Sequence, residues 1–263
     1  MTTDISSSQY DAFAPFYDGF TAASDYEVWT AQVLKVSEPH WVPGSALLDV
    51  ACGTGNSFMP FLNRGFDVTG CDASTAMLAE AARKAPGATL VQADMRELAM
   101  LDRFDLVTCF DDSLNYLHDE DELLAALRGI AANLAHRGVA LFDLNTLRAY
   151  RTTFARDRVH ERDGVVFAWR GGSAPDAEPR CIAAAEIEVF APAGDPLYER
   201  VTTRHEQRHF PIADVAELIA AAGLRCAAVH GVLDDGSLVE RADEERDLKS
   251  LFIATNARGG DAQ

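Results

Sequence analysis

Hydrophobic residues recur along the chain first at helical spacing and then in short runs that alternate with helical segments. Aromatic residues at positions 10, 13 and 17 predict a helix over 10–20, and 25–36 continues as an amphipathic segment with Ser24 as its expected N-cap. Beyond these segments, apolar runs of strand length occur at 46–51, 66–71, 88–92, 104–110 and 138–144. Helical segments separate them, and this alternation predicts a parallel sheet with helices on both faces.

The pattern changes after residue 145, where strand-like runs follow one another without helices. The runs 165–170, 182–190 and 198–210 are separated by turn sequences rich in Gly and Pro, which predicts a small antiparallel sheet inserted into the α/β domain. A helix at 211–222 and strands at 224–229 and 251–255, joined by an acidic loop at 234–247, then complete the core. We therefore expect the following organisation: helical lid 1–44, α/β core 45–145, inserted β subdomain 146–210 and C-terminal part of the core 211–257.

A glycine-containing turn follows the first predicted strand, in the sequence LLDVACGTGN over residues 47–56. Glycine at 53 and 55 lets the backbone approach a ligand closely, and the start of a helix just beyond offers free backbone N–H groups. The turn lacks the third glycine of the dinucleotide motif and the GK[ST] of a P-loop, so both phosphate-binding patterns fit less well. A tight turn with no ligand is the structural alternative.

The segment DVACGTG resembles the first motif of the class I S-adenosylmethionine-dependent methyltransferases, D/E-x-G/A-x-G-x-G. The similarity continues in order: Asp72 closes the second strand, where the family places a carboxylate on the ribose hydroxyls, and Asp94 follows the third, where the family places an Asp near the adenine amino group. The resemblance implies a Rossmann-like, doubly wound, mostly parallel seven-stranded sheet. It also implies S-adenosylmethionine as cofactor, contacted by Tyr17, Trp29, Asp49, Ala51, Gly53, Gly55, Asp72, Ala73, Met77, Asp94, Met95 and Phe110.

Several of these residues also have purely structural interpretations. Asp72 is a possible N-cap ahead of Ser74, Asp94 suits the cap of the short segment that follows it, and Met77 suits core packing as well as a position beside the adenine. A looser similarity, carried by the aromatic N-terminal helix, the insertion and HEQRHFPIADVAELIAAAGL, is to actinobacterial amino-sugar and antibiotic-tailoring methyltransferases. That subfamily implies an amine on a sugar or antibiotic precursor as the acceptor.

The acceptor is expected beyond the carboxyl ends of the parallel strands, where open α/β sheets bind their ligands. The sequence after the fourth strand, DDSLNYLH over 111–118, is dense in polar groups at that edge. We predict the catalytic residues to be Tyr17, Asp112, Tyr116 and His118. We predict the residues that contact the acceptor to be Tyr10, Asp111, Asn115, His205 and His209. A capping turn at His118 and lid packing of Tyr10 are the structural alternatives.

Thr203, His205, Gln207 and His209 recur at spacing two and so share one face of a predicted strand. That face has three interpretations: an exposed polar surface, an interface between subunits of a homo-oligomer, or a wall of the acceptor pocket. In the last case His205 or His209 is a candidate base for transfer to a hydroxyl.

Composition narrows the range of partners. A formal net charge of −18 repels polyanions, which argues against nucleic acid and favours a small, cationic or amine-bearing acceptor. The five cysteines form no CxxC pair, so we expect no metal site and free thiols in a reducing cytoplasm. No apolar run approaches the roughly 20 residues that span a bilayer, and residues 1–9 lack a secretory pattern, so we expect no membrane association.

The absence of one unmistakable base favours methyl transfer to nitrogen, because an amine needs only to be neutral when it attacks, whereas a hydroxyl needs a base. Transfer to the oxygen of a natural product is the first alternative. A methyltransferase-fold protein with a non-methyl reaction and a nicotinamide-dependent oxidoreductase are the others.

Overall fold

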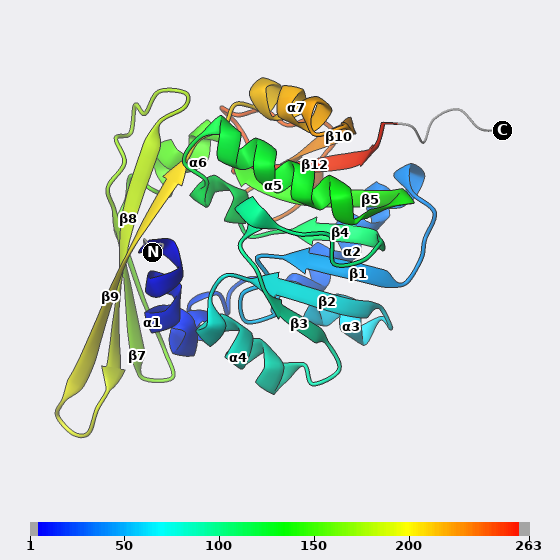
Figure 1. The fold of residues 1–263 in the computed structure, drawn as a ribbon. Helices are drawn as coiled ribbons and strands as arrows, with labels where there is room; N and C mark the ends of the chain where they lie inside the picture. Colours follow the sequence, from blue (N-terminus) through cyan, green and yellow to red (C-terminus); the bar gives the residue numbers. More distant parts are fainter. Residues whose placement is uncertain (1–4, 258–263) are drawn as a thin grey trace.

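The computed structural model describes residues 5–257, with side chains described from residue 10 onward. Its core is one sheet in the order β11-β10-β12-β5-β4-β1-β2-β3 (Figure 1). The strands are β1 (Ala46–Val50), β2 (Asp67–Asp72), β3 (Thr89–Gln92), β4 (Phe104–Cys109), β5 (Leu134–Asn145), β10 (Leu224–Val232), β11 (Leu238–Val239) and β12 (Lys249–Asn256). β1 to β5 run parallel, and β12 pairs antiparallel with β5 and β10. The α/β class is confirmed, and the short β11 adds an eighth strand to the seven expected.

Helices cover both faces of this sheet because successive strand residues point to opposite sides. Leu48 of β1 packs in one buried cluster with Ile219, whereas Leu47 packs in another with Val33. The helices of the core are α2 (Tyr26–Ser37), α3 (Met59–Asn63), α4 (Thr75–Lys84), α5 (Glu120–Asn133) and α7 (Ile212–Ala221). The doubly wound arrangement predicted from the alternating pattern is therefore present.

Two helix starts differ from the sequence prediction. The N-cap of α2 is Asp25, whose Oδ1 accepts a hydrogen bond from the Val28 N–H at 3.0 Å, so the expectation of Ser24 was wrong. α3 starts at residue 59 and not directly beyond the glycines, because the residues between the glycines and Phe58 continue as turns.

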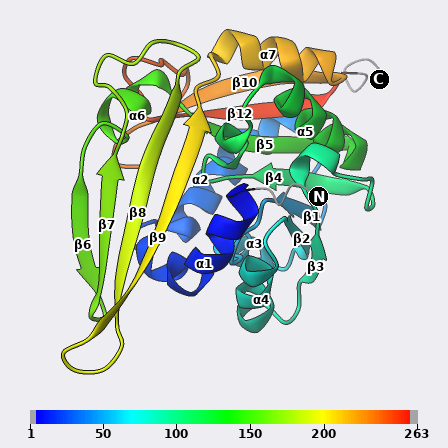
Figure 2. The same cartoon turned by 60° about the vertical axis from the view of Figure 1, so that its left-hand side comes forward.

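The inserted sheet has the order β6-β7-β8-β9 and is antiparallel throughout. Its elements are α6 (Leu147–Thr152), β6 (Arg158–Arg162), β7 (Val165–Gly171), β8 (Ile182–Pro192) and β9 (Tyr198–Arg208). α6 and β6 were not predicted. The sheet stands apart from the core, and α1 (Ile5–Phe20) lies between the two (Figures 1 and 2). Phe13 of α1 packs against Phe167 and Val189 of the insert.

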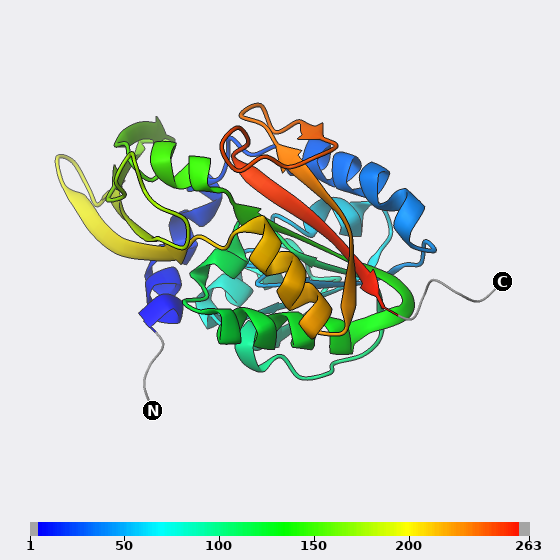
Figure 3. The same cartoon turned by 90° about the horizontal axis from the view of Figure 1, so that it is seen from above.

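The position of the insert decides where the site lies. Seen from above, α1 and the inserted sheet lie together beyond one side of the core (Figure 3). The carboxyl ends of β1 and β4 are neighbours in the sheet and meet this side. Within residues 5–257, no helix combines the length and the apolar character needed to cross a bilayer.

Candidate functional site

The turn after β1 is held open by backbone conformation. Ala51, Gly53 and Gly55 have φ values of 55°, 53° and 87°, and only glycine adopts this region without cost. A Cβ at Gly55 would lie 2.6 Å from the Phe58 ring, so the turn packs tightly on its inner side. A Cβ at Gly53 would meet nothing within 4 Å. The loop therefore leaves an open surface at Gly53 to which a ligand has access.

Two carboxylates, Asp49 and Asp72, form hydrogen bonds with residues of this loop. Asp49 is 1% exposed, and its two oxygens accept hydrogen bonds of 2.6 Å from the hydroxyls of Ser57 and Thr108. Burial raises the pKa of Asp49 to about 7, although both hydroxyls oppose the shift. Asp72, half-buried at the end of β2, accepts the Gly53 N–H on one oxygen at 2.8 Å. Its other oxygen accepts the Ser74 N–H at 2.8 Å, and burial raises its pKa.

In the segment after β3, Asp94 caps the turn that follows it, which the sequence analysis gave as its structural alternative. Asp94 is the N-cap of a short 3-10 turn, where Oδ1 accepts the Arg96 N–H at 2.9 Å. The Arg96 guanidinium also binds both of its oxygens, which outweighs burial and holds the pKa of Asp94 below its ordinary value. Met95 is half-buried, and Met77 of α4 is 1% exposed within the core.

α1 is tied to the glycine loop by a group of four side chains that we call the Asp18 clasp. Asp18 accepts hydrogen bonds from the Thr54 hydroxyl at 2.6 Å and the Asn56 amide at 3.0 Å. The Lys84 ammonium, from the end of α4, donates to Asp18 and Asn56 at 2.6 Å each. Earlier in α1, Asp11 accepts the Ser74 hydroxyl at 2.6 Å. None of these contacts was predicted, because each joins residues far apart in sequence.

A second group of polar residues follows β4, in the stretch that the sequence singled out. Asp111 and Asp112 both have positive φ, 58° and 51°, a conformation that Asp tolerates better than most residues. The Tyr26 hydroxyl donates to Asp111 Oδ2 at 2.8 Å. Burial raises the pKa of Asp111 to about 6, with the nearby Lys249 opposing the shift. The sharp turn thus directs two adjacent carboxylates into the space beyond the sheet.

Lys249, the first residue of β12, joins these carboxylates to the core, and sequence reasoning missed it. Its ammonium lies 2.8 Å from Asp112 Oδ1 and 2.7 Å from Asp143 Oδ2 on β5. Burial alone would lower the pKa of Lys249, but Asp112, Asp143 and Asp111 outweigh it and hold the pKa well above its ordinary value. Burial raises the pKa of Asp143 despite the adjacent ammonium.

β9 forms the opposite side of this group. Thr203, His205, Gln207 and His209 are each at most 3% exposed, so the face they share is not an exposed polar surface. Gln207 donates to Asp112, and His205 Nδ1 lies 2.9 Å from the Tyr116 hydroxyl. His205 Nε2 lies 2.9 Å from the Thr203 hydroxyl. Burial lowers the pKa of His205 to about 4, although Asp112 opposes the shift, so the imidazole is neutral at pH 7.

Aromatic rings from the lid close the group. Tyr10 packs edge-on against Tyr116 and His205, with centroids 5.6 and 5.3 Å away, and lies 6.3 Å from Tyr17. Burial raises the pKa of Tyr17 well above its ordinary value, and Asp111 is the largest electrostatic contributor to the shift. We call this group of side chains the acidic pocket: Tyr10, Tyr17, Tyr26, Asp111, Asp112, Tyr116, His205 and Lys249.

The other sequence-predicted residues lie around this group. The Trp29 ring packs edge-on against Phe110 at 5.6 Å. Asn115 is buried, with its side chain bonded to the backbone of Asn145 and Arg208, so it links η3 (Ser113–Tyr116) to β5 and β9. Ala73 is half-buried beside Asp72.

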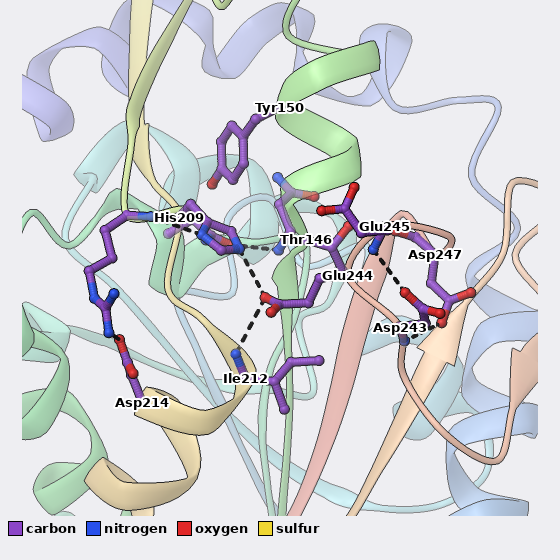
Figure 4. A network of polar contacts seen from close by, with 12 residues as sticks. Thr146, Tyr150, His209, Ile212, Asp214, Asp243, Glu244, Glu245 and Asp247 are labelled. Carbon is purple, nitrogen blue, oxygen red and sulfur yellow. Dashed lines mark hydrogen bonds and ion pairs between the residues drawn. The ribbon is translucent and has the colours of Figure 1, made fainter. Parts of the chain in front are cut away.

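Two histidines lie outside the acidic pocket. His118 is exposed, and its N–H donates to Glu122 Oε2 at 2.7 Å, the capping turn given as its structural alternative. His209 is buried at the junction between β9 and α7 (Figure 4). Its Nδ1 accepts the Arg180 N–H at 3.1 Å, and its Nε2 lies 2.9 Å from Glu244 Oε1. We include neither histidine in the site proposed below.

Comparison with known proteins identifies the family. Residues 47–138 match the model of a family described as a methyltransferase domain. The chain is 30% identical over 199 residues to dTDP-3-amino-3,6-dideoxy-alpha-D-glucopyranose N,N-dimethyltransferase of Streptomyces fradiae, with 70% of each chain covered. It is 29% identical over 221 residues to the putative methyltransferase YqeM of Bacillus subtilis, covering 82% of this chain and 86% of that protein. The crystal structure of an S-adenosylmethionine-dependent methyltransferase from Clostridium acetobutylicum matches with a TM-score of 0.78 and 25% identity, over 94% of this chain and 98% of that one.

The chain belongs to the S-adenosylmethionine-dependent methyltransferases. This confirms the family and the cofactor expected from the glycine motif. The geometry of the glycine loop in this methyltransferase also fits the cofactor, independently of the comparisons. Gly53 leaves open space where a side chain would stand, and the half-buried Asp72 carboxylate beside it has further lone pairs to accept hydroxyl protons. These two residues would hold the cofactor, while Asp49 supports the loop from within the core.

Proposed function

We propose that this methyltransferase transfers a methyl group from S-adenosylmethionine to the nitrogen of an amine on a small, sugar-like molecule. The Streptomyces fradiae relative, whose name describes N,N-dimethylation of a nucleotide-bound amino sugar, supports the acceptor class. The chemistry of the acidic pocket supports the choice of nitrogen over oxygen. The cofactor supplies an electrophilic methyl group, so the protein needs to hold the acceptor in line with it and to accommodate the charge that results.

The observation that carries the proposal is that the acidic pocket is anionic and that its histidine, His205, is a weak base. Asp112 and Asp143 are both engaged by Lys249, and both nitrogens of His205 lie within hydrogen-bond distance of hydroxyls. With a pKa near 4, His205 is too weak a base to deprotonate a sugar hydroxyl efficiently. A neutral amine needs no such base, and nearby carboxylates stabilise the positive charge that its nitrogen acquires.

Each side chain of the acidic pocket then has a defined part. The Asp111 carboxylate accepts a hydrogen bond from the neutral Tyr26 hydroxyl and, unlike Asp112 and Asp143, is not bonded to Lys249. We assign it to bind the acceptor nitrogen and take up its proton. Tyr17 and Tyr116 bring phenolic hydroxyls to the same space and orient the acceptor. Gln207 fixes Asp112 by donating to it. His205 keeps Tyr116 in place and does not itself transfer a proton.

A matched pair of acceptors tests the proposal. The protein is incubated with S-adenosylmethionine and either a dTDP-3-amino-3,6-dideoxyglucose or the same nucleotide sugar with a 3-hydroxyl group, and products are analysed by mass spectrometry. We expect S-adenosylhomocysteine and a sugar heavier by one or two CH2 units with the amine only. Methylation of the hydroxyl sugar in preference to the amine would overturn nitrogen as the target. If neither sugar reacts, a panel of simple primary amines is tested next. Methylation of one of these amines would reject the sugar but keep nitrogen as the target, and no methylation would reject nitrogen as well.

A further inference from the structure

The charges of the acidic pocket and of the adjoining Asp143 do not balance. Asp111, Asp112 and Asp143 contribute three carboxylates, whereas Lys249 contributes the ammonium bonded to two of them. Asp143 is 1% exposed, and its Oδ1 is buried without a hydrogen-bond partner among the described residues. The described residues also include no group of side chains suited to hold a metal ion. An anionic excess with an unpartnered buried oxygen therefore remains for a positively charged ligand to compensate.

This excess lies next to the donor loop. β4 pairs with β1 in the sheet, so Asp111, two residues beyond β4, follows the strand adjacent to the one that leads into Gly53. α1 connects the same two places: Asp18 binds Thr54 and Asn56 of the glycine loop, while Tyr10 packs edge-on against Tyr116 of the segment after β4. The carboxylates after β4 and the glycine loop after β1 therefore follow adjacent strands at the same edge of the sheet.

The donor changes charge during the reaction. The acceptor lone pair forms a bond to the methyl carbon, the carbon–sulfur bond breaks, and its electron pair stays on sulfur. The cationic sulfonium thus becomes a neutral thioether, and the positive charge moves to the acceptor. A fixed anionic site of low dielectric distinguishes these two states, since it attracts only the charged one.

We propose that the Asp111–Asp112–Asp143–Lys249 cluster makes the donor site prefer the positively charged methyl donor over the neutral S-adenosylhomocysteine left after transfer. Asp111 strengthens this preference, and Lys249 limits it by neutralising part of the cluster. The preference favours replacement of spent cofactor by fresh donor. It rests on family membership and on the charges of the cluster, and holds whether the acceptor atom is nitrogen or oxygen.

Binding measurements without any acceptor test the proposal. Calorimetry at a pH of about 7.5, where Asp111 is ionised, gives the dissociation constants of S-adenosylhomocysteine and of sinefungin, in which an amine-bearing carbon replaces the methylsulfonium. The charge preference is the ratio of the first constant to the second. We expect Asp111→Asn to lower this ratio at least ~5-fold, which is ~1 kcal/mol, and Lys249→Met to raise it.

The variants are chosen so that a folding defect does not imitate the effect. Asn tolerates the positive φ of residue 111 as Asp does, so Asp111→Asn keeps the turn. Asp67→Asn, at the exposed start of β2, removes the same charge far from the acidic pocket and should leave the ratio unchanged. If Lys249→Met does not fold, the Asp111→Asn result alone decides. An unchanged ratio in Asp111→Asn, or an equal fall in Asp67→Asn, would overturn the proposal, and neither outcome depends on the acceptor assay.

Discussion

At the scale of single residues, the chemistry of His205 follows from its surroundings and not from its type. An exposed histidine titrates near neutral pH and is a ready base. His205 is 2% exposed, and its pKa falls to about 4 because burial penalises the charged imidazolium more than Asp112 favours it. The sequence identified it as a candidate base from its spacing along a strand. The low pKa that argues against this role depends on burial of His205 by α1 and η3. The spacing of residues along the strand gives no information about that packing.

This shift predicts a pH dependence of stability. The folded pKa of about 4 lies below the ordinary 6.5, so the unfolded chain binds a proton in this range that the native state does not. His205 should therefore lower the free energy of unfolding as pH falls from 6.5, by about 3 kcal/mol at pH 4. Urea unfolding of the parent and of His205→Gln across this range measures it. The free energy of the parent minus that of the variant should fall as the pH falls, and a constant difference would refute the shift.

The candidate cofactor residues could be predicted from the sequence, and the acidic pocket only in part, because their contacts differ in distance along the chain. Gly53 and Asp72 are 19 residues apart, and their positions follow from a turn and a strand end that the sequence announces locally. Lys249 bonds Asp112 across 137 residues, and no local pattern marks it. The polar stretch after β4 could be recognised as a site, but the residues that neutralise or orient it could not.

At the scale of elements, ionic hydrogen bonds hold α1 against the core. Its inner face is aromatic, but the Asp18 clasp is what fixes it to the glycine loop. Exposed ion pairs contribute little individually, and Asp18 and Lys84 keep 45% and 23% of their side-chain surface. Because the ammonium also bonds Asn56 and Thr54, loss of one charge loosens several contacts at once.

Removing the clasp should therefore affect the lifetime of the bound cofactor. We expect Lys84→Met to weaken S-adenosylhomocysteine binding about 3- to 10-fold, which is about 1 kcal/mol, mainly through faster dissociation. Stopped-flow displacement followed by tryptophan fluorescence measures the rate. Lys35→Met, an exposed lysine in the last turn of α2, is the matched control. Equal dissociation rates in the parent and Lys84→Met would mean that the clasp does not hold the lid.

The two elements that the sequence analysis did not predict, β6 and α6, lack a clear periodic pattern of apolar and polar residues. β6 is exposed along its whole length, RVHER, and an edge strand without an apolar face has no alternating pattern to detect. α6 has six residues and buries Leu147, Ala149 and Tyr150, too few turns to establish helical periodicity. By contrast, the strands buried in the core were found close to their observed positions, because their burial requires the apolar runs that predicted them.

At the scale of the whole molecule, one junction joins the inserted sheet to the core at both of its chain crossings (Figure 4). On entry, Thr146 bonds the carbonyl of Asp247. On exit, His209 lies 2.9 Å from Glu244, which also accepts the Ile212 N–H at 3.3 Å. Both crossings are thus fastened to the loop that leads directly into Lys249. The junction sets the position of β9 and of the ammonium that binds Asp112.

Loosening the junction should affect the acceptor side and leave the donor side intact. We expect Glu244→Ala to lower the free energy of unfolding by about 1–2 kcal/mol, because it leaves a buried histidine and a backbone N–H without their acceptor. Hydrogen exchange should rise in β9 but not in the glycine loop. Glu245→Ala, whose exposed side chain pairs with Arg151, is the control. Uniformly faster exchange throughout the protein would show that the junction has no selective role.

The place of the insertion between β5 and α7 also sets the order in which the two halves of the site are completed during synthesis. The contacts described for the glycine loop and the Asp18 clasp span at most 66 residues, so they can form as soon as the first part of the sheet has emerged from the ribosome. The acidic pocket needs contacts of 95 and 137 residues, and the loop-closure entropy of such contacts makes them slow. Because β12 lies between β10 and β5, Lys249 reaches its carboxylates only when this last strand enters the sheet. A nascent chain therefore acquires its glycine loop well before it completes the acidic pocket.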